Sequence, residues 1–118
     1  MIYYDANIFG YNVADCTIRA ISVAEGISWD RAYRKLSDYA RKRGLMMSSV
    51  ESIEQYLDDK YERICVPDMT VGEFAYTNPE GIFLVTMQGH ITCIIDGYIV
   101  DSFDCGDREM ICAWYVKG

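Results

Sequence analysis

The hydrophobic and polar positions divide this chain into a helical first half and a strand-rich second half. An apolar stretch, "CTIRAISVAE", follows Asp15, which is a good N-cap residue, and stops at Gly26. We therefore predict a first helix over residues 16–25. Two further helices are expected before residue 61, because apolar residues recur there at intervals of three and four.

The second helix is expected to open at Ser28 and to end at Gly44. Its predicted apolar side consists of Trp29, Tyr33, Leu36 and Ala40. The third helix is expected to start at Ser48, because Ser48 and Glu51 have the spacing of a capping box. Its predicted inward residues are Val50, Ile53 and Leu57.

The pattern changes towards short β-branched and aromatic runs in the second half. "RICV" (63–66) predicts a short strand, and Thr70 with Glu73 predicts one helical turn by capping-box spacing. Residues 82–87, 90–95, 98–103 and 111–116 predict four further strands. Helices followed by strands indicate an α+β domain over residues 1–118, with N-terminal helices packed on one face of a C-terminal antiparallel sheet.

Composition and charge restrict the possible partners. The 118-residue chain has a net charge of −7 and a pI near 4.5, whereas nucleic-acid binders normally carry a basic patch. The basic run at 41–43 fits the C-terminal end of the second helix. No apolar stretch approaches the ~20 residues that cross a bilayer, and the first ten residues do not resemble a signal peptide. We expect no nucleic-acid or membrane partner, and the oligomeric state stays open.

The five cysteines at positions 16, 65, 93, 105 and 112 indicate reduced thiols in a cytoplasmic protein, because their number is odd and no CxxC occurs. Cys93, Cys105 and Cys112 are too spread out for a recognisable zinc motif. We interpret them as small buried hydrophobes and expect neither a metal nor a cofactor.

The stretch "QGHITCIIDGYIVDSFD" carries the candidate chemistry. It contains His90, the only histidine, and the dipeptide Asp96-Gly97, which favours a two-residue type I′ turn. That turn places Thr92 opposite Asp101 and makes His90 a diagonal neighbour of Asp101 on the same face, roughly 7–8 Å away between backbones. A slip of one residue would separate the two side chains. The sequence therefore predicts a His–Asp pair, which typically serves a nucleophile.

Cys16 is the candidate nucleophile, because it opens the first predicted helix. The N-terminal end of a helix favours a thiolate, and an imidazole nearby lowers the thiol pKa further. The negative charge of Asp15 opposes this effect unless its side chain is turned into the helix cap. Each residue also has a purely structural interpretation: Cys16 as a buried helix cysteine, His90 as a hydrogen-bonded histidine and Asp101 as a strand-end carboxylate.

The order of these residues resembles the papain-like cysteine peptidase superfamily. "DCTIRA", "GHITCIIDGYIVDSFD" and the closing "AWY" look like its compact bacterial and phage branch, near the bacteriocin-processing and cell-wall amidase-like members. The resemblance covers nearly the whole chain and implies a papain-like fold. It also implies a catalytic triad with Cys16 as nucleophile, His90 as general base and acid, and Asp101 as the residue that orients the imidazole.

One part of the family pattern is missing from this sequence. The family usually supplies a Gln a few residues before the Cys as an oxyanion donor, and no Gln lies in that region. Asn12 is the nearest amide, Asn7 lies further away, and Gln88 lies beside His90. Losing one oxyanion donor typically costs about a hundredfold to a thousandfold in turnover.

We expect a cysteine-dependent hydrolase or acyltransferase that acts on an amide or thioester, with a peptide, a protein or another amide-containing molecule as the substrate. A peptidase, an amidase, a deamidase and an acyltransferase all use this apparatus. The alternative is a catalytically inactive papain-like scaffold, of bacterial or phage origin, that binds or inhibits a protein. A basic partner would suit the acidic cluster Asp58, Asp59 and Glu62. A nucleotide-binding function lacks a Gly-rich phosphate loop.

Overall fold

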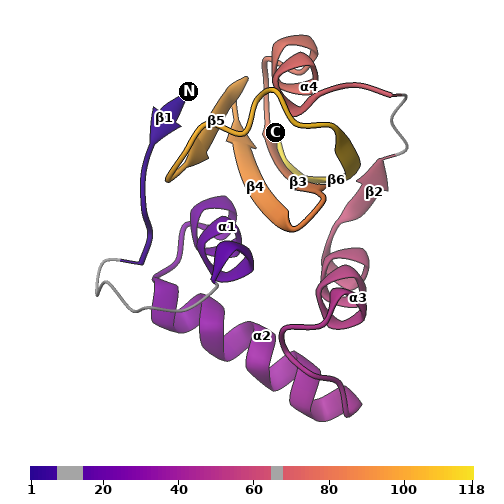
Figure 1. Cartoon of the computed structure of the whole chain (residues 1–118). Helices are drawn as coiled ribbons and strands as arrows, with labels where there is room; N and C mark the ends of the chain where they lie inside the picture. Colours follow the sequence, from indigo (N-terminus) through magenta and orange to yellow (C-terminus); the bar gives the residue numbers. More distant parts are fainter. Residues whose placement is uncertain (8–14, 65–67) are drawn as a thin grey trace.

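The computed structural model describes residues 1–7, 15–64 and 68–118 and shows an α+β fold with a mixed sheet (Figure 1). Its helices within these residues are α1 (Cys16–Glu25), α2 (Trp29–Arg43), α3 (Val50–Lys60) and α4 (Val71–Thr77). Its strands are β1 (Ile2–Tyr3), β2 (Glu62–Ile64), β3 (Ile82–Met87), β4 (His90–Ile95), β5 (Tyr98–Asp101) and β6 (Met110–Lys117).

The strands form one sheet in the order β1-β5-β4-β3-β6-β2. All neighbouring strands are antiparallel except β1, which runs parallel to β5 through Ile2 opposite Val100 and Tyr3 opposite Asp101. The expectation of an antiparallel sheet is therefore wrong at this edge. Two residues are too short a run to show the alternation by which a strand is recognised in a sequence.

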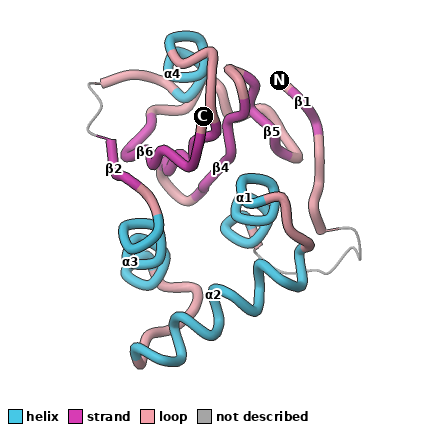
Figure 2. The backbone as a smooth tube through the Cα atoms, turned by 180° about the vertical axis from the view of Figure 1, so that it is seen from behind, coloured by secondary structure: helices cyan, strands magenta, loops and turns pink. Residues whose placement is uncertain are grey.

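Helices cover both faces of the sheet, which corrects the expectation that they pack on one face. The first hydrophobic core joins α1, α2 and α3 to strand residues such as Leu84, Cys93 and Trp114. The second core joins α4 to strand residues on the opposite face of the sheet, including Val85 and Ile94. Figures 1 and 2 show α1 and α4 on opposite sides of the strands. The central strands β3 and β4 are largely apolar on both faces, and both of their faces are largely buried.

The first helix has the predicted bounds, with Gly26 in the left-handed conformation at its C-terminal end. The second also begins after Ser28 and ends before Gly44, but its inward side is shifted: Ala32 is buried, whereas Tyr33 is 45% exposed and stacks on Trp29. In an ideal helix Ala32 and Tyr33 are equally good partners of Trp29 by spacing, so packing decided between them.

The third helix is capped by Ser49, not by the predicted Ser48, and the Ser49 hydroxyl accepts a hydrogen bond from the Ser52 N–H. As a result Val50, predicted to point inward, is 70% exposed, and Tyr56 lies in the core with Leu57. The predicted capping box before α4 is confirmed by reciprocal Thr70–Glu73 hydrogen bonds.

Strands β3 and β4 have the predicted bounds, β5 is two residues shorter than predicted and β6 extends one residue further at each end. The "RICV" prediction is confirmed in part by β2, and its last residues lie outside the described ranges. None of the helices in the described ranges is long and apolar enough to cross a membrane.

The turn between β4 and β5 forms at Asp96-Gly97 as predicted. Both residues have positive φ, 49° and 81°, as a type I′ turn requires. The register places Ile95 opposite Tyr98 and Ile94 opposite Ile99. This turn therefore determines which strand residues meet across the hairpin, including those of the candidate site.

Candidate active site

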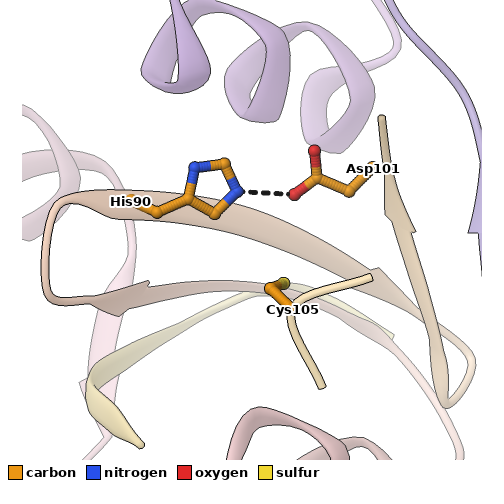
Figure 3. A group of neighbouring side chains, drawn as sticks. All are labelled: His90, Asp101 and Cys105. Atoms are coloured by element: carbon orange, nitrogen blue, oxygen red, sulfur yellow. Dashed lines mark hydrogen bonds and ion pairs between the residues drawn. The ribbon is translucent and has the colours of Figure 1, made fainter. Parts of the chain in front are cut away.

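The predicted His–Asp pair forms at the far end of the β4–β5 hairpin (Figure 3). His90 begins β4 directly after a two-residue turn that contains Gly89 at φ 72°, and Asp101 ends β5. The distance between His90 Nε2 and Asp101 Oδ2 is 2.7 Å. Both residues are buried, and the Phe103 ring lies 4.7 Å from the imidazole. The geometric prediction for these two residues is confirmed.

Asp101 is held by two further donors. The Thr92 hydroxyl donates to Oδ2 at 2.6 Å, and the Ser102 backbone N–H donates to Oδ1 at 2.7 Å. Burial alone would raise the pKa of the Asp101 carboxyl, but the bonds from His90, Thr92 and Ser102 outweigh it and lower the pKa. Asp101 is therefore a fixed anion. Thr92 was predicted on this face, but its role as a donor to Asp101 was missed, although its place opposite Asp101 was a sufficient signal.

Cys16, the first residue of α1, lies at the same imidazole. Its thiol is half-buried, and the His90 side chain and the Ile91 backbone lie close enough to lower its pKa. Because Nε2 of His90 is engaged by Asp101, Nδ1 is the ring nitrogen left for a thiol. All three residues predicted for the triad are thus brought together, although they come from α1, β4 and β5.

The electrostatics of this group favour a thiolate beside a charged imidazole. Burial would raise the pKa of the Cys16 thiol, but the hydrogen bonds with His90 and Ile91 and the charge of His90 lower it overall. Burial would lower the pKa of His90, but hydrogen bonds with Asp101, Cys105 and Cys16 raise it to about 11. Both pKa shifts favour the charged form of the two side chains.

The other cysteines have different surroundings. Cys93 is fully buried next to Asp101, and burial followed by that negative charge raises its thiol pKa to about 12. Cys112 lies on β6, 3.4 Å from a nitrogen of Arg63 on β2. Cys105 is fully buried and contacts His90, which the sequence did not indicate. These four described cysteines are free thiols, and Cys65 lies outside the described ranges.

Asp15 occupies the predicted N-cap position, but its side chain makes no cap hydrogen bond. Its carboxylate instead accepts a 2.7 Å hydrogen bond from Trp29 Nε1 and pairs with Arg19 at 3.2 Å. The condition under which the Asp15 charge would matter little, a side chain turned into the cap, is therefore not met. Its contacts with Trp29 and Arg19 balance the charge instead.

The space beside Cys16 is small. Tyr4, Arg19, Thr92 and Asp101 are among the residues around a cavity of about 10 Å³, which has room for about one water molecule. The cavity is therefore too small to hold a molecule of peptide size. Tyr4 is held there by its backbone N–H, which donates to the Asp101 carbonyl at 2.8 Å.

The predicted oxyanion donor Asn12 lies outside the described residues. Of the other two amides, Gln88 is exposed in the β3–β4 turn, and Asn7 is 8% exposed. The acidic cluster proposed for a basic partner is partly neutralised within the chain. Asp58 forms two 2.9 Å hydrogen bonds with Arg63, and Asp59 lies 3.2 Å from Arg43.

No protein-family model matches the chain, and no curated protein or solved structure matches it either. The contacts of Cys16, His90 and Asp101 are therefore the basis for the functional proposal.

Proposed function

We propose that this protein is a cysteine-dependent acyl-transfer enzyme with a Cys16–His90–Asp101 triad. The observation that carries the proposal is the arrangement around one ring: Asp101 binds His90 Nε2 at 2.7 Å, and Cys16 contacts the same imidazole from the start of a helix. A nucleophile, a base and a group that orients the base are the parts that covalent acyl transfer needs.

The reaction would begin with attack of the Cys16 thiolate on an amide or thioester carbonyl. The backbone N–H of Cys16 would bind the developing oxyanion at the N-terminal end of α1. His90 would then donate its Nδ1 proton to the departing amine or thiol, which leaves a thioester on Cys16. Water would next lose a proton to neutral His90 and attack the thioester, which releases the acid and restores the ion pair.

Papain-like architecture is our proposal for the fold family, because a Cys at a helix start precedes a strand His and a carboxylate on the next strand. It suits a peptidase, an amidase, a deamidase or an acyltransferase, with a peptide, protein or other amide as the substrate. A protein-binding scaffold without catalysis is the alternative, and the paired state of Asp58 and Asp59 leaves the acidic cluster less able to attract a basic partner.

An activated ester tests the proposal without knowledge of the substrate. We expect p-nitrophenyl acetate to acetylate Cys16, detected by peptide mass spectrometry after an acid quench, with a burst of p-nitrophenol. Cys16→Ser should abolish the burst, because a serine hydroxyl does not ionise near neutral pH as a thiol can. His90→Ala should slow acylation by about a hundredfold or more, since general base and acid catalysis typically contributes that much.

Cys112→Ser provides the matched control, because Cys112 is also a partly buried thiol but lies on β6, which β3 separates from the strand of His90. It should leave the burst unchanged. Acetylation spread over several cysteines, or a burst that survives Cys16→Ser, would refute the proposed nucleophile. A folded protein with no acylation at all would favour the binding scaffold.

We further propose that the protein works in the reducing cytoplasm. A thiol titration of the denatured, unreduced protein should then find five free thiols, four of which are the free cysteines of the described residues. Three free thiols would mean that one bridged pair exists and would contradict the cytoplasmic assignment.

A further inference from the structure

Cys105 is a buried thiol that the proposed reaction does not use. It lies after β5 within the second core and is fully buried. The donor atoms of His90, Asp101 and Cys105 all lie within 4.8 Å of one another (Figure 3). The chain thus brings a nitrogen, a carboxylate oxygen and a sulfur together in a site where none of the three residues is exposed.

These donors suit zinc in kind and in spacing. Zinc accepts His nitrogen, Cys sulfur and Asp oxygen, and bond lengths of 2.0–2.3 Å place neighbouring tetrahedral ligands roughly 3.3–3.8 Å apart. The observed Nε2–Oδ2 distance is 2.7 Å and the largest separation in the group is at most 4.8 Å, so each donor would have to move by about 1 Å or less. Cys105 lies outside the helices and strands, where such a shift disturbs no ladder hydrogen bond.

We propose that His90, Asp101 and Cys105 form an inhibitory binding site for Zn²⁺, with a water molecule as the fourth ligand. Cys16 is not part of this ligand set, because it is not one of the clustered donors. The wide sequence spacing of these three residues hides the site from a motif search, since the fold and not a short loop assembles it.

Metal binding would occupy the ring nitrogen that faces Asp101. Zn²⁺ would take the lone pair of His90 Nε2 in place of its proton, and Cys105 would bind as a thiolate. His90 then keeps its proton on Nδ1 and has no lone pair left to act as a base. Inhibition of acyl transfer follows from this step and rests on the proposed function, whereas metal binding itself does not.

The test uses the full-length protein and zinc alone, in competition with a chromophoric chelator. Wild-type protein and Cys16→Ser should each bind one equivalent of Zn²⁺. Cys105→Ser and Cys105→Ala should bind at least about tenfold more weakly, because even loss of an outer-shell partner costs that much. With Co²⁺ as the probe, wild-type protein should show a thiolate charge-transfer band that both Cys105 variants lack.

Cys93→Ser is the matched control, since Cys93 is equally buried but is not one of the clustered donors. It should bind zinc as wild type does, and it shows whether loss of any buried thiol weakens binding through the fold. The proposal is overturned if wild type binds no zinc, or if Cys16→Ser abolishes binding while Cys105→Ser retains it. Cys16→Ser is inactive under the proposed mechanism, so zinc binding by this variant tests the metal site independently of catalysis.

Discussion

Cys16 should react with iodoacetamide far faster than an ordinary thiol at mildly acidic pH. Its pKa is lowered below the usual value despite burial, through hydrogen bonds with His90 and Ile91 and the His90 charge. At pH 6.5 a thiol with a pKa of about 8.5 is only about 1% thiolate, so a Cys16 that is largely ionised should react about 10- to 100-fold faster. The measurement is the rate of Cys16 alkylation against pH, followed by peptide mass spectrometry with chelator present.

His90→Ala should raise, by one unit or more, the pH at which the Cys16 alkylation rate increases. The substitution removes the charged partner and one hydrogen bond, whereas burial, which raises the thiol pKa, remains. The rate at pH 6.5 should therefore fall at least about tenfold, the factor that one pKa unit represents. Cys16→Ser should remove the fast-reacting population altogether.

The thiols of Cys93 and Cys112 serve as internal references in the same experiment. Cys93, with its pKa raised to about 12, should stay unmodified in the folded protein. Slow alkylation of Cys16 with a rate that His90→Ala leaves unchanged would contradict the ion pair and with it the enzyme proposal. The fold would then be better understood as a binding scaffold.

The sequence predicted this site well because a local rule determines it. Asp96-Gly97 sets the turn, the turn sets the register, and the register places Thr92 and His90 on the face that carries Asp101. The position of Cys16 followed from the predicted bounds of the first helix. Asp15 marked its start, and the apolar stretch up to Gly26 marked its length. Each step depends on residues that are neighbours in sequence or across one hairpin.

The features that were missed depend on packing between distant segments. Cys105 meets His90 only after the chain has left β5, and no local pattern predicts that return. The Asp15 carboxylate turns to Trp29, 14 positions away, because α2 packs against α1. Likewise β1 becomes a strand only by pairing with β5. A single sequence carries no signal for such contacts beyond the residue types themselves.

Asp101→Asn should reduce the free energy of unfolding by about 3 kcal/mol at pH 5.5. Asp101 is a buried anion with three hydrogen-bond donors, one of them the charged His90, and removing one partner of a buried pair typically costs 3–5 kcal/mol. Asn keeps part of the hydrogen bonding, which places the expected loss at the lower end of that range. Urea unfolding followed by tryptophan fluorescence, with chelator present, measures it.

The difference between wild type and Asp101→Asn should depend on pH in a direction that the two pKa values set. The folded-state pKa of His90 is raised to about 11, so its contribution is complete below the unfolded value of about 6.5 and is lost as pH rises towards 11. The pKa of Asp101 is lowered, so its contribution is complete above about 3.9 and is lost as pH falls below that value. The difference should therefore be largest between about pH 4 and 6.5 and clearly smaller at pH 10.

Asp38→Asn is the control variant, because it changes an exposed carboxylate that lies 3.9 Å from Arg41. It should alter the free energy of unfolding by less than about 0.5 kcal/mol at every pH. An equal loss for Asp101→Asn at pH 5.5 and pH 10 would show that the carboxylate supports the fold without an ion pair to His90.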